Sequence, residues 1–126
     1  MKNFLEPISF VATAHPQEAK AFYGDVLGME LVEDSPFALV FSEGGQMLRI
    51  QKVPQLSPAS YTVHGWRVAD IEQQIARLAS KGVEFLTFER LEQSASGVWT
   101  SPDGHKVAWF RDPSGNNLSL TQFAPE

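Results

Sequence analysis

The chain has 126 residues, of which 43% are hydrophobic and 20% are charged, with a net charge of −5 and no cysteine. This length and composition predict one compact globular unit that buries its core without disulfides or thiolate chemistry. The acidic balance and the scattered Lys and Arg residues argue against a nucleic-acid-binding protein, which needs a basic stripe to follow phosphates.

The N-terminal residues carry no signal for export or membrane insertion. Glu6 and Pro7 stand where the apolar core of a signal peptide or a membrane span would run. We therefore expect a cytoplasmic protein that binds neither nucleic acid nor a membrane.

The first half of the chain predicts one strand, one helix and three further strands. Residues 7–13 are rich in β-branched and apolar residues, as in a strand. Pro16 suits the first turn of a helix, and Gly28 would end that helix. Strands are expected at 29–33, 37–42 and 46–53, the last two joined by a turn at Gly44 and Gly45. The apolar face of the helix would comprise Ala19, Phe22, Tyr23, Val26 and Leu27.

The second half repeats this order after a proline-containing segment, 54–60, which predicts a linker. A strand is expected at 61–68. Asp70 followed by Gln73 predicts the start of a helix, as in a capping box, and Gly82 would end it. Residues 90–97 predict a loop. Further strands are expected at 83–88, 98–101, 106–110 and 118–123.

The two halves share a pattern, because both helices end in Gly-x-Glu followed by Leu31 or Phe85. The order β-α-β-β-β therefore occurs twice, and neither half of about 60 residues would bury its helix and sheet well alone. We predict an α+β fold with a single domain over 1–126. Its first module would span 7–53, its linker 54–60 and its second module 61–123.

Two motifs carry a resemblance to a known family. Residues 21–28 read Ala-Phe-Tyr-x-x-x-Leu-Gly and residues 110–116 read Phe-Arg-Asp-Pro-Ser-Gly-Asn, each followed by a strand. With the repeat between them, these motifs resemble the vicinal oxygen chelate superfamily, which includes glyoxalases, bleomycin resistance proteins and dioxygenases. The resemblance implies two βαβββ modules that form a half-open curved sheet around a cavity, usually completed in a homodimer.

The resemblance also implies four metal-ligand positions, on the first and last strand of each module. Counting from the motifs places them at Ile8, Arg49, Val63 and Ser119. A divalent metal needs neutral or anionic N, O or S donors, so this set predicts no metal and no cofactor.

The three histidines offer few alternative ligands. A register shifted by one residue would bring His64 into the third metal position, but alternation favours the helix side for His64. His15 and His105 adjoin turn residues, which favours structural roles for both.

Arg49 lies mid-strand among apolar residues and at a position that should face the cavity. Two interpretations stay open: an arginine that reaches water over the sheet, and an anchor for an anion or a carbonyl group. Arg67 shares the strand parity of Val63 and is a second candidate for ligand contact.

Aromatic residues supply the other candidates. By alternation, Phe10 shares the face of Ile8, and Tyr61 that of Val63, whereas Trp66 falls on the core side. Trp99 and Trp109 would line either the cavity or the core.

Our first hypothesis is a metal-free protein that binds a small apolar or aromatic molecule, such as a drug or a metabolite, as a homodimer. The alternative is a metal-dependent enzyme of the lyase or dioxygenase type with a different ligand set; a metal-independent lyase or isomerase is a weaker third possibility. No nucleophile has a supporting base, so no catalytic residue is assigned and catalysis stays open. The candidate ligand-binding residues are Ile8, Phe10, Arg49, Tyr61, Val63, Arg67, Trp99, Trp109 and Ser119.

Overall fold

A computed structural model describes residues 3–126 of the chain. The backbone divides into two compact units, with the border between Ser57 and Pro58. This border falls inside the proline-containing segment 54–60. Each unit is described by itself.

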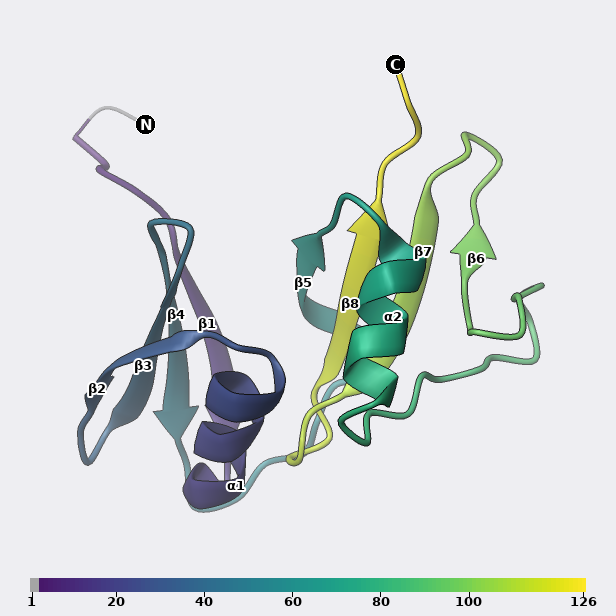
Figure 1. Cartoon of the computed structure of the whole chain (residues 1–126). Helices are drawn as coiled ribbons and strands as arrows, with labels where there is room; N and C mark the ends of the chain where they lie inside the picture. Colours follow the sequence, from purple (N-terminus) through teal and green to yellow (C-terminus); the bar gives the residue numbers. More distant parts are fainter. Residues whose placement is uncertain (1–2) are drawn as a thin grey trace. The chain divides into compact units, whose positions relative to one another are not determined.

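The first unit contains one mixed sheet with a helix on one face (Figure 1). The order of strands is β1-β4-β3-β2; β1 runs parallel to β4 and the other neighbours are antiparallel. The predicted sequence of one strand, one helix and three strands is confirmed for this unit. The elements are β1 (Ile8–Thr13), α1 (Pro16–Ala21), the π-helical turn η1 (Phe22–Val26), β2 (Glu30–Asp34), β3 (Ala38–Glu43) and β4 (Gln46–Lys52).

The predicted helix changes its geometry after Ala21. Leu27 N–H donates to the carbonyl of Phe22, five residues back, at 2.9 Å, and Gly28 then ends the helix with a φ of 84°. A π turn is wider than an α turn, so the 3.6-residue spacing of the predicted apolar face is interrupted. As a result Ala19 and Tyr23 are fully buried, whereas Phe22, Val26 and Leu27 are only partly buried.

The core of the first unit lies between α1 with η1 and one face of the sheet. The ring of Tyr23 packs against Phe41 at 6.0 Å between centroids. Leu48 and Ile50 lie beside Phe41 and Leu39 in the strand register and are buried with them. Because side chains alternate along a strand, the residues between them point to the opposite face.

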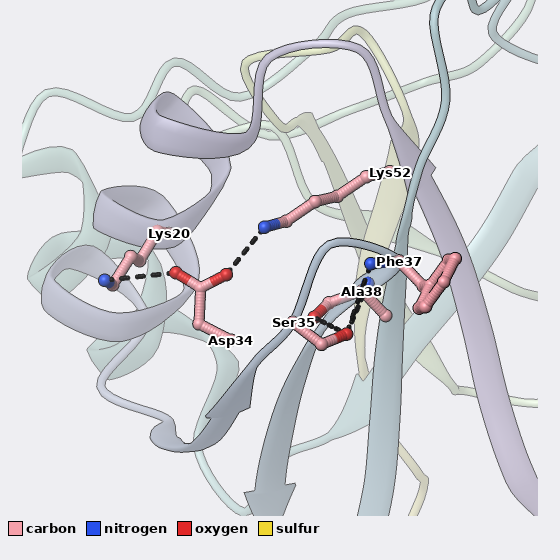
Figure 2. Close-up of polar contacts among 6 residues, drawn as sticks. All are labelled: Lys20, Asp34, Ser35, Phe37, Ala38 and Lys52. Carbon is pink, nitrogen blue, oxygen red and sulfur yellow. Dashed lines mark hydrogen bonds and ion pairs between the residues drawn. The ribbon is translucent and has the colours of Figure 1, made fainter.

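Asp34 connects three elements at the edge of this unit (Figure 2). Its two carboxylate oxygens accept from Lys52 Nζ at 2.6 Å and from Lys20 Nζ at 3.3 Å. The hydrogen bond from Lys52 is the main reason that the pKa of Asp34 lies below its ordinary value; partial burial opposes the shift and Lys20 adds to it. Exposed ion pairs of this kind contribute little to stability. They hold the end of β2 near α1 and β4.

The second unit repeats the architecture of the first (Figure 1). Its strand order, β5-β8-β7-β6, corresponds to that of the first sheet, with β5 parallel to β8. This correspondence confirms the α+β fold of two βαβββ-like modules. The elements are β5 (Thr62–Arg67), α2 (Ile71–Ala79), β6 (Trp99–Thr100), β7 (Lys106–Arg111) and β8 (Asn117–Gln122).

Helix α2 begins as predicted. The carboxylate of Asp70 accepts from the N–H of Gln73 at 3.1 Å, which satisfies one of the free donors of the first turn. The side chain of Gln122 accepts from the N–H of Ile71 at 2.9 Å, so the last strand also caps the helix. Gly82 follows with a φ of 92°, a conformation that glycine adopts without strain.

The prediction of a strand at 83–88 is wrong. The contacts of this segment with β7 are one isolated bridge, between Phe85 and Phe110, and a hydrogen bond from Leu86 N to Trp109 O at 2.8 Å. The reason is Gln93, whose side chain replaces a strand partner. Its Oε1 accepts from Phe88 N at 2.7 Å, and its Nε2 donates to Leu86 O and Gly97 O at 3.0 and 2.9 Å.

No helix in the described part of the chain is long and apolar enough to cross a membrane.

Candidate functional site

Trp109 lies on the face of the second sheet that points away from α2. On the helix-facing side, Phe110 stacks with Trp66 at 6.4 Å and contacts Phe85 at 5.4 Å between centroids. Alternation along β7 therefore places Trp109 on the other side. The predicted core-side position of Trp66 is confirmed.

Several residues share this outer face, which we call the tryptophan face. Trp109 pairs with Ser119 in the register, Ser119 pairs with Gly65, and Trp99 pairs with Val107 two residues from Trp109. Both tryptophans therefore lie outside the helix-facing core, and their contact with a ligand stays a prediction. The tryptophan face consists of Thr62, Gly65, Phe88, Trp99, Trp109 and Ser119.

The indole of Trp109 is held by contacts on several sides. Its Nε1 donates to Thr62 Oγ1 at 3.1 Å, and that hydroxyl donates to the buried Asn117 Oδ1 at 3.3 Å. Phe88 meets the indole edge-on at 5.4 Å, and Trp99 lies tilted against it at 6.3 Å. The three rings remain partly exposed. Together they form an aromatic surface that these contacts and the hydrogen bond to Thr62 hold in place.

Gly65 sits directly against Ser119. A Cβ at position 65 would overlap the Ser119 hydroxyl and lie 3.0 Å from its carbonyl oxygen, which no flexible movement of a side chain relieves. Glycine is therefore required for close pairing of the two strands.

A bulge interrupts the alternation at the start of β5. Thr62 pairs with Asn117 and His64 with Leu118, so Val63 is an extra residue without a partner. Tyr61 precedes the strand and is 71% exposed, while Val63 is 37% exposed. Alternation from Val63 therefore no longer assigns a side to Tyr61, and ligand contact by either residue stays a prediction.

Arg49 occupies the corresponding outer face of the first sheet. It lies between Phe10 and Val40 in the register, opposite in parity to the helix-facing Leu48 and Ile50. Its half-buried side chain makes no hydrogen bond or ion pair with the described residues of its own unit. Ile8 and Phe10 are 45% and 58% exposed. A guanidinium with free donors is thus set in a mainly apolar surface.

Arg67 pairs with Thr121 as Gly65 pairs with Ser119, so it lies on the same side of the second sheet as the tryptophan face but outside the contacts around Trp109. It is at the end of β5, with its guanidinium carbon 5.2 Å from the ring centre of Phe123. His105 contacts the same ring edge-on at 5.2 Å. This group is separate from the contacts around Trp109.

The chain matches the sequence model of the Glyoxalase/Bleomycin resistance protein/Dioxygenase superfamily over residues 6–120. The chain belongs to this superfamily. The resemblance in the two motifs is confirmed. No curated protein matches the chain significantly.

Several solved structures have the same fold. A putative glyoxalase family protein from Bacillus anthracis is 25% identical, with a TM-score of 0.70, and the match covers 98% of this chain and 100% of that one. A lactoylglutathione lyase from Agrobacterium tumefaciens is 20% identical, with a TM-score of 0.73 and 96% of each chain covered. TnmS3, an antibiotic binding protein from Streptomyces sp. CB03234, is 24% identical, with a TM-score of 0.71 and coverage of 95% and 98%. The last two show the fold alone.

The positions that the superfamily would use for a metal do not fit one in this chain. They hold Ile8, Arg49, Val63 and Ser119, in which the hydroxyl of Ser119 is the single neutral oxygen donor. A fixed cation and two apolar side chains cannot complete a divalent coordination shell. Among residues 3–126, no three His, Cys, Asp or Glu side chains come together.

His64 is on the wrong face to add a ligand. It pairs with the buried Leu118 and meets Trp66 edge-on at 4.7 Å, so it lies on the helix side as predicted. Burial disfavours its charged form and lowers the pKa of His64.

Sequence reasoning missed the residues that fix the tryptophan face. Phe88 was expected in a regular strand, and Thr62 was not considered as a site residue. A loop was expected at 90–97, but no role was predicted for Gln93 within it. Thr62 is a polar β-branched residue in a predicted strand, which is only a weak indication that it bonds an aromatic side chain. The hydrogen bonds between the Gln93 side chain and main-chain groups leave no recognisable pattern in the sequence.

Proposed function

We propose that this superfamily member binds a small, largely apolar or aromatic molecule on the tryptophan face. The observation that carries this proposal is the fixed indole of Trp109, bonded to Thr62 and flanked by Phe88 and Trp99. A ring held in place before binding loses little freedom when a ligand stacks on it, which favours affinity. Ligand sites are typically lined in this way by aromatic groups with a few polar ones.

Ser119 and Gly65 complete the tryptophan face next to Trp109. Because Gly65 has no side chain, β5 packs closely against Ser119 beside the indole. The Ser119 hydroxyl offers a polar contact to a ligand that lies across β8.

On the first unit we propose Arg49 as an anchor for a carboxylate, a carbonyl or another electron-rich group. The support is its half-buried position beside Phe10 without a partner among the described residues of that unit. A guanidinium keeps its charge when partly desolvated and binds two oxygens at once. Ile8 and Phe10 would provide the apolar part of the same surface.

A protein with the same fold provides a precedent for binding of this kind. TnmS3 is described as an antibiotic binding protein. We extend that class of function to this chain, including sequestration of a drug or metabolite, and we propose that it acts as a homodimer.

The ligand set of the superfamily is the reason for preferring binding without metal. Ile8, Arg49, Val63 and Ser119 offer no coordination shell. The competing candidate, a metal-dependent lyase or dioxygenase with a different ligand set, makes an opposite prediction. The purified protein would then hold a stoichiometric transition metal that is lost on changing His64.

A thermal-shift screen of small aromatic acids, amides and amines tests the proposed function. We expect planar anionic or carbonyl-bearing compounds to raise the melting temperature of the protein, and Arg49→Ala to reduce that shift. Arg90→Ala is the matched control, because Arg90 lies exposed in a loop of the other unit. If a binding compound stabilises the wild type and Arg49→Ala equally, the anchor role is wrong.

A further inference from the structure

A second feature of the second unit lies at the end of β5 and β8. An open hollow of about 730 Å³ is bordered by Arg67, His105, Phe123 and Glu126, together with residues 68–69 and 124–125. Its size is that of a small-molecule site. None of these residues is among the six that define the tryptophan face, although Arg67 lies on the same side of the sheet at the end of β5.

Arg67 presents its charge to this hollow. The guanidinium lies over the ring of Phe123, with 5.2 Å between its carbon and the ring centre, and the residue is exposed. It makes no hydrogen bond or ion pair with the described residues of its own unit. Stacking on an aromatic ring orients the planar group and leaves the N–H donors at its edge available.

His105 supplies a second donor with a defined tautomer. Its Nδ1 accepts from the N–H of Ala124 at 3.0 Å, so in the neutral ring the proton is on Nε2. Among the described residues, every side-chain nitrogen that is shut off from solvent has a hydrogen-bond partner. Nε2 of His105 has none within the second unit, so this N–H is in contact with solvent. The imidazole also contacts Phe123 edge-on at 5.2 Å.

We propose that this hollow binds a small carboxylate with a planar apolar body. The carboxylate would accept from the guanidinium of Arg67 and from Nε2–H of His105, while the body packs on Phe123, which is 49% exposed. Glu126 is the acidic residue of the lining and opposes an anion. The site does not depend on the proposed function, because it uses neither Trp109 nor Arg49.

Titration of the ¹⁵N-labelled protein with benzoate, followed by amide NMR signals, tests the proposal. Benzoate should shift the signals of Arg67, His105 and Ala124. Arg67→Gln should weaken binding about tenfold, since it removes a charged pair. Glu126→Gln should strengthen binding about two- to fivefold by removing repulsion. Arg90→Gln, an exposed arginine of the same unit, should leave the affinity unchanged.

Two further probes and one further variant give the results that would overturn the proposal. If benzamide binds as tightly as benzoate, or if Arg67→Gln binds as well as the wild type, recognition of the carboxylate is wrong. If inorganic phosphate binds as tightly, the role of the apolar body is wrong. Phe123→Leu should weaken benzoate about threefold, which tests the ring even if Arg67→Gln does not fold. Benzoate shifts confined to the Trp109 indole would overturn this proposal and leave the proposed function intact.

Discussion

Trp109 on β7 reaches across the central strand β8 and donates a hydrogen bond to Thr62 on β5, 3.1 Å away. The Thr62 hydroxyl in turn donates a hydrogen bond to Oδ1 of Asn117, a residue that is 2% exposed. The orientation of the most prominent aromatic ring of the second unit is therefore set by a hydroxyl group.

Replacing Thr62 by Val removes this hydroxyl at nearly constant volume. We expect the free energy of unfolding to fall by about 1 kcal/mol, because two hydrogen bonds are lost and Asn117 keeps an unmet acceptor. The Trp109 indole N–H signal should also shift in NMR spectra. Thr100→Val in exposed β6 is the control. Equal stability of the two variants, with no change at Trp109, would disprove the role of Thr62.

Gly65 should tolerate no side chain. Gly65→Ala forces a Cβ against Ser119, and we expect a loss of about 1–3 kcal/mol in unfolding free energy. Adding Ser119→Ala removes the hydroxyl but leaves the carbonyl, so it should restore only part of the loss. In Gly24→Ala the new Cβ would be 3.7 Å from Phe41, an ordinary contact, which makes it a suitable reference for urea unfolding. A Gly65→Ala variant as stable as Gly24→Ala contradicts the steric argument.

Gln93 should control the order of the loop that carries Phe88. Gln93→Leu removes three hydrogen bonds to main-chain groups, and we expect a loss of about 2 kcal/mol. Hydrogen exchange should accelerate most at Phe88 N, whose partner is lost. Glu92→Leu, at an exposed neighbouring position, serves for comparison. Unchanged protection of Phe88 in Gln93→Leu would show that other contacts hold the loop.

Stability should depend on pH through His64. Burial lowers its pKa in the folded chain below the ordinary value of about 6.5. Between the two pKa values the unfolded chain binds more protons, so the contribution of His64 is fully present above the unfolded pKa and is lost as the pH falls toward the folded one.

Urea unfolding between about pH 5 and pH 7.5 measures this effect. The free energy of unfolding of the wild type should decrease toward acid, and His64→Leu should flatten that decrease. The exposed His15→Asn should keep the wild-type slope. Identical slopes for wild type and His64→Leu would exclude His64 as the source.

The repeat in the sequence was sufficient to predict the architecture of each unit. Glycines after both helices and a proline before the first are local signals that depend little on tertiary context, which is why Gly28 and Gly82 end helices as expected. Because β4 runs without interruption, alternation gives the side of the sheet on which Arg49 lies, while its contact with a ligand stays a prediction.

Alternation failed where the register changed. The bulge at Val63 adds one residue to β5, and this insertion left no signature in residue type. The π turn after Ala21 disturbed the helical face in the same manner. The loop around Gln93 depends on side-chain to main-chain bonds between residues up to seven positions apart, which hydrophobic periodicity does not encode.

The three indole N–H signals of the protein test the central claim most directly. Trp109 and Trp99 lie on the proposed ligand surface, whereas Trp66 stacks on Phe110 on the helix side and acts as an internal reference. We would titrate 2-naphthoate into labelled protein, with Trp99→Phe and Trp109→Phe to assign the signals. The account predicts saturable shifts of Trp109, smaller ones of Trp99, and none of Trp66. Binding that shifts Trp66 alone, or no shift of any indole, would contradict it.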